Sequence, residues 1–397
     1  MLRDMETQIG VFWVVISALL SCTTPQQKRE VSQWVELDRA AAISCSPWPI
    51  QESELDVASV SATSAGKGGF VATMRLRNGS QLPVFAETNG SVVVSKGSRK
   101  PFPIGRNAHV IAVSYWKKEP VAFVIQNKNE RAWLEIRAIR DNRMISRMAT
   151  PFSDEAASGS LILAENGWWL QVNHNDMLSS FVYVNPENGV NWKFMPSAFQ
   201  SSSRFTTLVG NAKNSSSFVV EHTKNGDENQ SQFAITRLDE TGKFSEAGKL
   251  SVATKGGLES WSSSMIGQAI ILALVRGDSL IGQGVLNVIA ANISETGVSE
   301  SWRKEFPYPD VHLGEPTWLS NGSGAFLGIM RWIDAEATMS RIKVDSSGAV
   351  LIGDSGVFSK GTVLAAGYLN DSGKGLGAFR FREKELWKYN LCEISSK

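Results

Sequence analysis

The sequence has 397 residues, of which 42% are hydrophobic and 20% charged, so the chain can bury a large core. Its 40 Lys and Arg residues balance 39 Asp and Glu residues, which leaves a net charge of +1. Because there is no basic excess and no basic run, we expect no nucleic-acid partner. The histidines are too far apart for a local zinc motif, and no metal is expected, although a site assembled in space stays open. They are His109, His174, His222 and His312.

The N-terminus carries a short apolar run at residues 9–20, IGVFWVVISALL. As a helix it would reach about 18 Å, less than the roughly 30 Å hydrocarbon core of a membrane. Such a run near residue 1 is typical of a signal peptide. It ends in Leu-Leu-Ser-Cys at residues 19–22, which resembles the bacterial lipobox. The resemblance covers residues 1–22 and implies cleavage before Cys22, which would carry the lipid.

One feature departs from the lipobox pattern, because Arg3 is accompanied by Asp4 and Glu6, so the first residues lack the usual positive charge. An ordinary signal peptide or a short anchor helix is the alternative. The resemblance divides the chain into a signal peptide (1–21), a lipidated N-terminus with a polar tether (22–36) and a body (37–397). Thr23 follows the cysteine, and in lipoproteins of two-membrane bacteria the absence of Asp there implies the outer membrane. We therefore expect an exported, lipid-anchored protein on the periplasmic or surface face.

The body contains a repeated turn. A polar turn that usually ends in Gly follows a β-rich run at residues 90, 142, 189, 242, 297 and 348. A regular spacing of about 50 residues is typical of propeller blades. A second hairpin signal lies between these turns, for example at residues 66–68 and 373–375, and strand-like segments flank it. Pro-aromatic pairs such as Pro307-Tyr308 mark where one unit passes to the next. The pattern predicts an all-β fold, a single β-propeller of about seven four-stranded blades.

The two ends of the chain complete the last blade in this scheme. The last unit stops after a third strand at residues 386–394, and residues 40–49 read as a lone fourth strand. Pairing the two covers sheet edges that an open ring would expose. Cys45 and Cys392 lie on these two strands, and export favours a disulfide between them. Two separate buried thiols are the alternative.

No catalytic constellation is visible in the sequence. Gly-Lys-Gly at 66–68 and 373–375 lacks the phosphate-loop spacing. Residues 225–229 resemble the start of a calcium loop, but Gln230 and Thr236 stand where such a loop has its turn glycine and its bidentate glutamate. There is no Gly-x-Ser-x-Gly motif for a serine nucleophile. We therefore expect no enzyme activity and no cofactor. Asp56, His109 and Thr206 fall at equivalent first-strand positions and are candidates to line an axial channel.

One local pattern is similar to a known repeat. Residues 181–194, FVYVNPENGVNWKF, resemble a quinoprotein-type propeller repeat, and residues 294–306 echo its second half. Such repeats build propellers in periplasmic dehydrogenases and in a lipoprotein of the outer-membrane β-barrel assembly machine. The match covers two of about seven repeats. The sequence thus favours a membrane-anchored platform for protein or ligand binding in the cell envelope. The alternative is a propeller hydrolase or lyase acting on an envelope glycan.

Overall fold

The computed structural model describes five short strands before residue 100 and most of the chain from residue 108 to 394. The early strands are residues 44–47, 60–64, 69–75, 81–87 and 92–93. Between 108 and 394 the residues not described are 117–118, 129–130, 139–140, 142, 151–155, 165–166, 175–178, 186–190, 196–205, 212–215, 225–228, 240–243, 255–256, 279–282, 309–310, 321–324, 334–335, 360, 370–374 and 384–385. The chain divides into two units, Met1–Ala40 and Ala41–Lys397, and everything described belongs to the second.

The described strands form seven antiparallel sheets, here called blades 1 to 7. Blade 1 holds β2 (Val60–Ser64), β3 (Gly69–Arg75), β4 (Gln81–Glu87) and β5 (Val92–Val93). Blade 2 holds β6 (Ala108–Trp116), β7 (Glu119–Lys128), β8 (Arg131–Ala138) and β9 (Met144–Ala149). Blade 3 holds β10 (Ala156–Ala164), β11 (Gly167–His174), β12 (Ser179–Asn185) and β13 (Asn191–Met195). Blade 4 holds β14 (Thr206–Asn211), β15 (Ser216–Lys224), β16 (Gln230–Leu238) and β17 (Phe244–Ala253).

The remaining blades contain the longest strands. Blade 5 holds β18 (Leu258–Ile266), β19 (Ala269–Asp278), β20 (Gln283–Ser294) and β21 (Gly297–Tyr308). Blade 6 holds β22 (His312–Leu313), β23 (Thr317–Ser320), β24 (Ala325–Ile333), β25 (Glu336–Asp345) and β26 (Gly348–Ser359). Blade 7 holds β27 (Val363–Leu369), β28 (Gly375–Glu383), β29 (Leu386–Ile394) and, at its outer edge, β1 (Ser44–Pro47).

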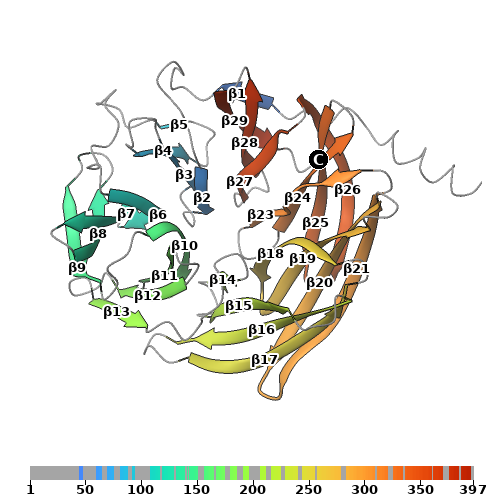
Figure 1. Ribbon diagram of the computed structural model, residues 1–397, viewed down its shortest axis with the longest axis horizontal. Helices are drawn as coiled ribbons and strands as arrows, with labels where there is room; N and C mark the ends of the chain where they lie inside the picture. Colours follow the sequence, from blue (N-terminus) through green and yellow to red (C-terminus); the bar gives the residue numbers. More distant parts are fainter. Residues whose placement is uncertain are drawn as a thin grey trace, which may run out of the picture. The chain divides into compact units, whose positions relative to one another are not determined.

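The innermost strands close a ring. In each blade one strand contacts its counterparts in the blades before and after it, in the order β2, β6, β10, β14, β18, β23, β27 and back to β2. The blades follow one another in this order within residues 41–397 (Figure 1). The fold is therefore all-β, a β-propeller, as the repeat predicted.

The predicted landmarks fall where the repeat requires them. The turns near residues 90, 142, 189, 242, 297 and 348 all join the third and fourth strands of their blades. The closure is also confirmed: β1 pairs antiparallel with β29, and Cys45 lies directly opposite Cys392 in that pairing. The predicted strand at residues 386–394 has the observed bounds of β29, whereas residues 40–49 contribute the shorter strand β1.

Blade 6 departs from the predicted four strands, because its inner strand is split into β22 and β23, which both pair with β24. The break falls at residues 314–316. Pro316 has no N–H for a ladder bond, so a continuous strand is interrupted there. The backbone N–H of Gly314 still donates to the carbonyl of Met330 at 2.8 Å, which holds the break against the sheet.

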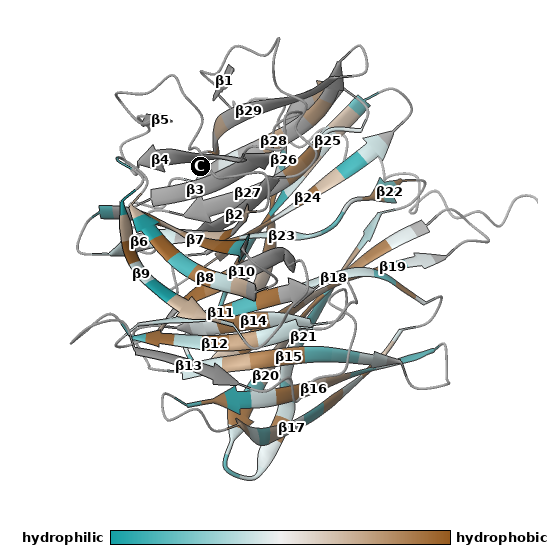
Figure 2. Cartoon of the chain, turned by 60° about the vertical axis from the view of Figure 1, so that its left-hand side comes forward, coloured by the Kyte–Doolittle hydropathy of each residue, from teal (hydrophilic) through white to brown (hydrophobic). Residues whose placement is uncertain are grey.

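The core lies in the seams between neighbouring blades. Burial alternates along strands such as β16, as expected where successive side chains point to opposite faces of a sheet. Apolar and polar segments accordingly interchange along the strands (Figure 2). Each of five described clusters of buried apolar side chains joins one pair of successive blades, from the blade 2–3 seam to the blade 6–7 seam. Each fully buried Leu, Ile or Phe side chain stabilises the fold by about 1.5–3 kcal/mol.

Polar bonds cross the same seams, and three of them come from tryptophan indoles. They run from Trp168 Nε1 to Ser114 Oγ (3.0 Å), from Trp302 Nε1 to the carbonyl of Ser346 (3.2 Å) and from Trp332 Nε1 to the carbonyl of Thr362 (3.1 Å). Each indole combines a large apolar ring system with one hydrogen-bond donor. It can therefore pack among apolar side chains and still bond to a group across the seam. Among the described residues, no helix is long and apolar enough to span a membrane.

Candidate functional site

The predicted axial residues lie on inner strands where they are described. Thr206 is the first residue of β14 and His109 the second of β6, and these are the corresponding inner strands of blades 4 and 2. Thr206 is buried, and its carbonyl accepts a hydrogen bond from Gln171 Nε2 in blade 3 at 3.4 Å. The side chain of His109 and the whole of Asp56 lie outside the described residues. A channel lined by the three residues stays a prediction.

The other predicted sites lie near the N-terminus. Cys22 lies outside the described residues, so lipidation stays a prediction. Cys392 is fully buried in β29, and the pairing of β1 with β29 places the backbone of Cys45 opposite it. The strand pairing behind the predicted disulfide is thus observed, and the covalent bond stays a prediction.

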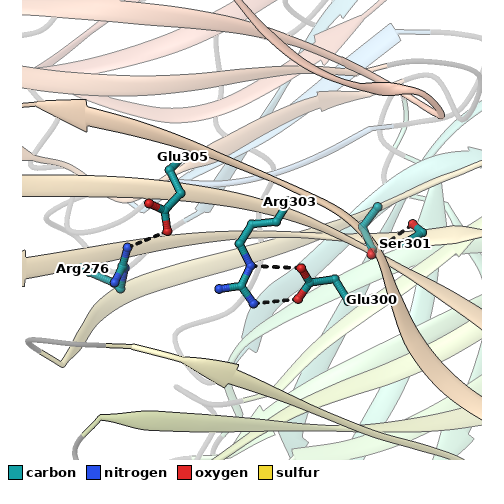
Figure 3. Close-up of polar contacts among 6 residues, drawn as sticks. Arg276, Glu300, Ser301, Arg303 and Glu305 are labelled. Atoms are coloured by element: carbon teal, nitrogen blue, oxygen red, sulfur yellow. Dashed lines mark hydrogen bonds and ion pairs between the residues drawn. The ribbon is translucent and has the colours of Figure 1, made fainter.

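Sequence reasoning did not find the charged groups of the outer strands. In blade 5, Arg276 Nη2 donates to Glu305 at 3.0 Å, and Arg303 makes two bonds to Glu300, at 3.1 and 2.6 Å (Figure 3). The hydrogen bonds that Arg303 donates to Glu300 raise the pKa of Arg303. Partly exposed pairs of this kind contribute about 0–1 kcal/mol each. Because each acid already faces an arginine, we assign this group a structural role.

Blade 2 has a more buried pair of the same kind. The side chain of Glu135 is 2% exposed and lies 2.6 Å from Arg137 Nη2 and 3.4 Å from Arg147 Nε. The guanidinium of Arg147 stacks over the ring of Trp133 at 3.9 Å. A buried carboxylate needs such partners, because removing it from water unpaired costs several kcal/mol. Glu135 is therefore already paired with two arginines, and we assign it a structural role too.

Blade 6 contains a polar group with a different arrangement. Arg331 on β24 is 9% exposed, and its Nη1 donates to Asp354 on β26 and to Ser340 Oγ on β25, the latter at 3.4 Å. Ser340 Oγ in turn donates to the other carboxylate oxygen of Asp354 at 2.6 Å. Both oxygens of Asp354 are thus bonded, and the guanidinium is held at one end.

The opposite side of that guanidinium has no partner among the described residues. Arg331 Nε is a buried donor without a hydrogen bond, and Nη1 makes both hydrogen bonds of the side chain to described residues. Buried donors are almost always paired in folded proteins, so an unpaired one requires an explanation. Nε and Nη2 together form the flat edge of a guanidinium that binds two oxygens side by side. We call this pair of atoms the Arg331 edge.

The ring of Tyr308, from the neighbouring blade, lies under the Arg331 guanidinium. Tyr308 is the last residue of β21, is 2% exposed, and has its ring 5.1 Å from the Arg331 guanidinium carbon. Burial raises the pKa of its hydroxyl to about 12, although Ser340 and Arg331 act in the opposite direction. The Tyr308 hydroxyl is therefore neutral at physiological pH. Among Tyr308, Arg331, Ser340 and Asp354, only Asp354 carries a negative charge.

The arrangement is suited to binding and not to proton transfer. An arginine keeps its proton at every pH a cell reaches, so it holds an anion but does not act as a general acid or base. No set of three or more His, Cys, Asp or Glu side chains is placed to hold a metal within the described part of the chain.

No protein-family model and no curated protein sequence matches this chain. Among solved structures, hydrazine synthase from Kuenenia stuttgartiensis has a TM-score of 0.48 and 9% identity, covering 83% of this chain and 94% of that one. The WD40 domain of SCAP from fission yeast has a TM-score of 0.42 and 8% identity, covering 89% and 98%. The Dos1 propeller has a TM-score of 0.43 and 7% identity, covering 82% and 76%. No function is transferred from these proteins, and the propeller fold of this chain rests on its own sheet order.

Proposed function

We propose that this chain is an exported, lipid-anchored β-propeller that acts as a non-enzymatic binding platform in the cell envelope. The observation that carries the proposal is Arg331, a buried cation held at one end by Asp354 and Ser340, with a binding edge that has no described partner. A closed ring of sheets fixes such a group rigidly, and on scaffolds of this kind the binding chemistry is carried by particular sites and not by the fold.

The anchor would keep the platform close to a membrane. Ser44, the first residue of β1, follows Cys22 by 22 positions in the sequence. At roughly 3.3–3.6 Å per residue, that segment reaches at most about 80 Å. A partner in the same membrane would therefore meet the ring at a raised effective concentration.

Incorporation of labelled fatty acid tests the anchor. The wild-type chain should incorporate the label and fractionate with membranes, and Cys22→Ala should abolish the label and release the protein. Cys45→Ala is the matched control, since it removes another cysteine near the N-terminus and should leave labelling intact. Equal labelling of the wild type and Cys22→Ala would contradict the lipoprotein assignment.

Affinity capture from solubilised envelopes tests the platform. We expect a partner in stoichiometric amount that Arg331→Lys retains poorly and Arg303→Lys retains fully. Turnover of an envelope glycan without a stoichiometric partner would instead support a hydrolase or lyase and overturn the platform.

A further inference from the structure

We propose that the Arg331 edge is a carboxylate-binding site in the seam between blades 5 and 6. This names the chemical class of ligand for the proposed platform, but it does not depend on the lipid anchor. The ligand group is a carboxylate of a small molecule or of a peptide, bound through two parallel hydrogen bonds from Nε and Nη2.

The first argument is the fixed orientation of the guanidinium. Asp354 takes Nη1, and Ser340 bonds both Asp354 and Nη1, so the side chain is held by a closed set of three hydrogen bonds. A guanidinium held at the Nη1 end has its Nε–Nη2 edge set in one direction before any ligand arrives. Pre-organisation of this kind raises affinity, because less side-chain freedom is lost on binding.

The second argument is that the free edge is a donor that the fold leaves unpaired. Arg331 Nε is buried, and its missing bond costs about 1–3 kcal/mol while it stays unpaired. In blade 5 the corresponding edge of Arg303 has a partner. Its Nε and Nη2 donate to the two carboxylate oxygens of Glu300, at 3.1 and 2.6 Å (Figure 3). Arg303 thus shows, within the same chain, the two-oxygen partner that the Arg331 edge lacks.

The third argument concerns the shape and charge of the ligand group. The ring of Tyr308 lies 5.1 Å from the Arg331 guanidinium carbon, so a group in the guanidinium plane fits better than a bulky one. A planar carboxylate meets this condition, and a tetrahedral sulfate or phosphate does so less well. Asp354 lies nearby, so a single negative charge is repelled less than a double one.

The site lies where the chain crosses between blades. Tyr308 ends β21, and Arg331 pairs with Leu313 of the two-residue strand β22. Arg331 therefore lies next to the start of blade 6 and against the end of blade 5. A ligand bound there would contact both blades.

Nuclear magnetic resonance of the arginine Nε–Hε groups tests the proposal directly. The full-length chain in detergent, labelled with ¹⁵N-arginine, is titrated with sodium acetate, and sodium sulfate at equal ionic strength is the comparison. Arg331→Lys assigns the Arg331 signal by its disappearance, and Arg303→Lys is the control. We expect the Arg331 signal to shift saturably with acetate and to shift at least tenfold less at the same concentration of sulfate.

Asp354→Asn provides a second measurement. It keeps the size of the side chain and an oxygen that can accept from Nη1, but it removes the negative charge that repels a bound anion. We therefore expect acetate affinity to rise severalfold while the Arg331 signal remains visible. Equal shifts with acetate and sulfate, or no shift of the Arg331 signal in the folded wild type, would overturn the carboxylate site. Neither result bears on the lipid anchor, which fatty-acid labelling tests separately.

Discussion

At the residue scale, a glycine in β17 shows how closely two blades approach each other. Gly248 sits at a bulge in the pairing of β16 and β17 and has a φ of +143°. A Cβ on it would lie 3.0 Å from both the Cγ2 and the backbone nitrogen of Val298 in blade 5. Both the backbone conformation and the contact therefore require glycine.

Gly248→Ala should lower the free energy of unfolding by about 1–3 kcal/mol. Two glycines provide matched controls, since a Cβ at either meets nothing within 4 Å. Gly297 has a φ of +130°, so Gly297→Ala measures the conformational cost alone. Gly348 has no such φ, and Gly348→Ala should stay within about 0.5 kcal/mol of the wild type. Urea unfolding would rank the three, and equal losses at Gly248 and Gly297 would contradict the seam contact.

Tyr308 makes stability depend on alkaline pH. Its pKa is raised from 10.0 to about 12 in the folded chain, chiefly by burial. Between those values the unfolded chain loses the hydroxyl proton and the folded chain keeps it, so stability falls as pH rises above about 10. From pH 9 to pH 11 the loss should be about 1 kcal/mol. Tyr308→Phe should remove that part of the pH dependence in urea unfolding series, and identical slopes for the two proteins would show that the hydroxyl is not buried.

The candidate site could not be read from the sequence, and the reason is register. Arg331 and Asp354 are 23 residues apart and lie on β24 and β26. Their meeting depends on two bulges in the pairing of β25 with β26, at residues 337–339 and 341–342. A shift of one residue would move a side chain to the other face of the sheet. The turn glycines, by contrast, act locally, so their spacing alone predicted the blades.

At the scale of the strands, two tryptophans of blade 6 allow the seam hydrogen bond to be measured. Trp332 on β24 donates to the carbonyl of Thr362, whereas Trp318 Nε1 on β23 is buried without a partner among the described residues. Both side chains are partly buried. Replacing either with Phe removes the same volume, but only Trp332→Phe removes a hydrogen bond across the seam.

We expect Trp332→Phe to be about 1 kcal/mol more destabilising than Trp318→Phe. Thermal and urea unfolding of the two variants measure this difference directly. If Trp318→Phe costs as much as Trp332→Phe, the loss comes from packing, and the indole bonds add nothing to the seams.

The strand pattern shows what sequence periodicity can and cannot predict. The prediction of residues 386–394 as the third strand of the last repeated unit gave the observed bounds of β29. The split of the inner strand of blade 6 was missed. Pro316 cannot donate a ladder hydrogen bond. The sequence did not show, however, that β22 and β23 would both pair with β24 on either side of it.

At the scale of the ring, the closure depends on a very short strand. β1 has four residues, and its pairing with β29 involves Ser44 to Pro47 alone. Four residues supply few ladder bonds, whereas the other strands of blade 7 have seven to nine residues each. The segment that carries the predicted anchor leads directly into this strand, so any pull on the tether would act first on the weakest pairing of blade 7.

A disulfide between Cys45 and Cys392 would reinforce that pairing, and it is our last prediction. Directly opposed residues of an antiparallel pair have Cα atoms about 4.5–5.5 Å apart, within the roughly 4.4–6.8 Å that a disulfide needs. The closed loop includes nearly all of the body, so the bond should stabilise the fold by up to about 5 kcal/mol. In a Cys22→Ala background, the protein unfolded without reductant should bind no maleimide, and Cys45→Ala should expose one thiol. Two reactive thiols in protein isolated from the envelope would show that β1 holds the ring closed by strand pairing alone.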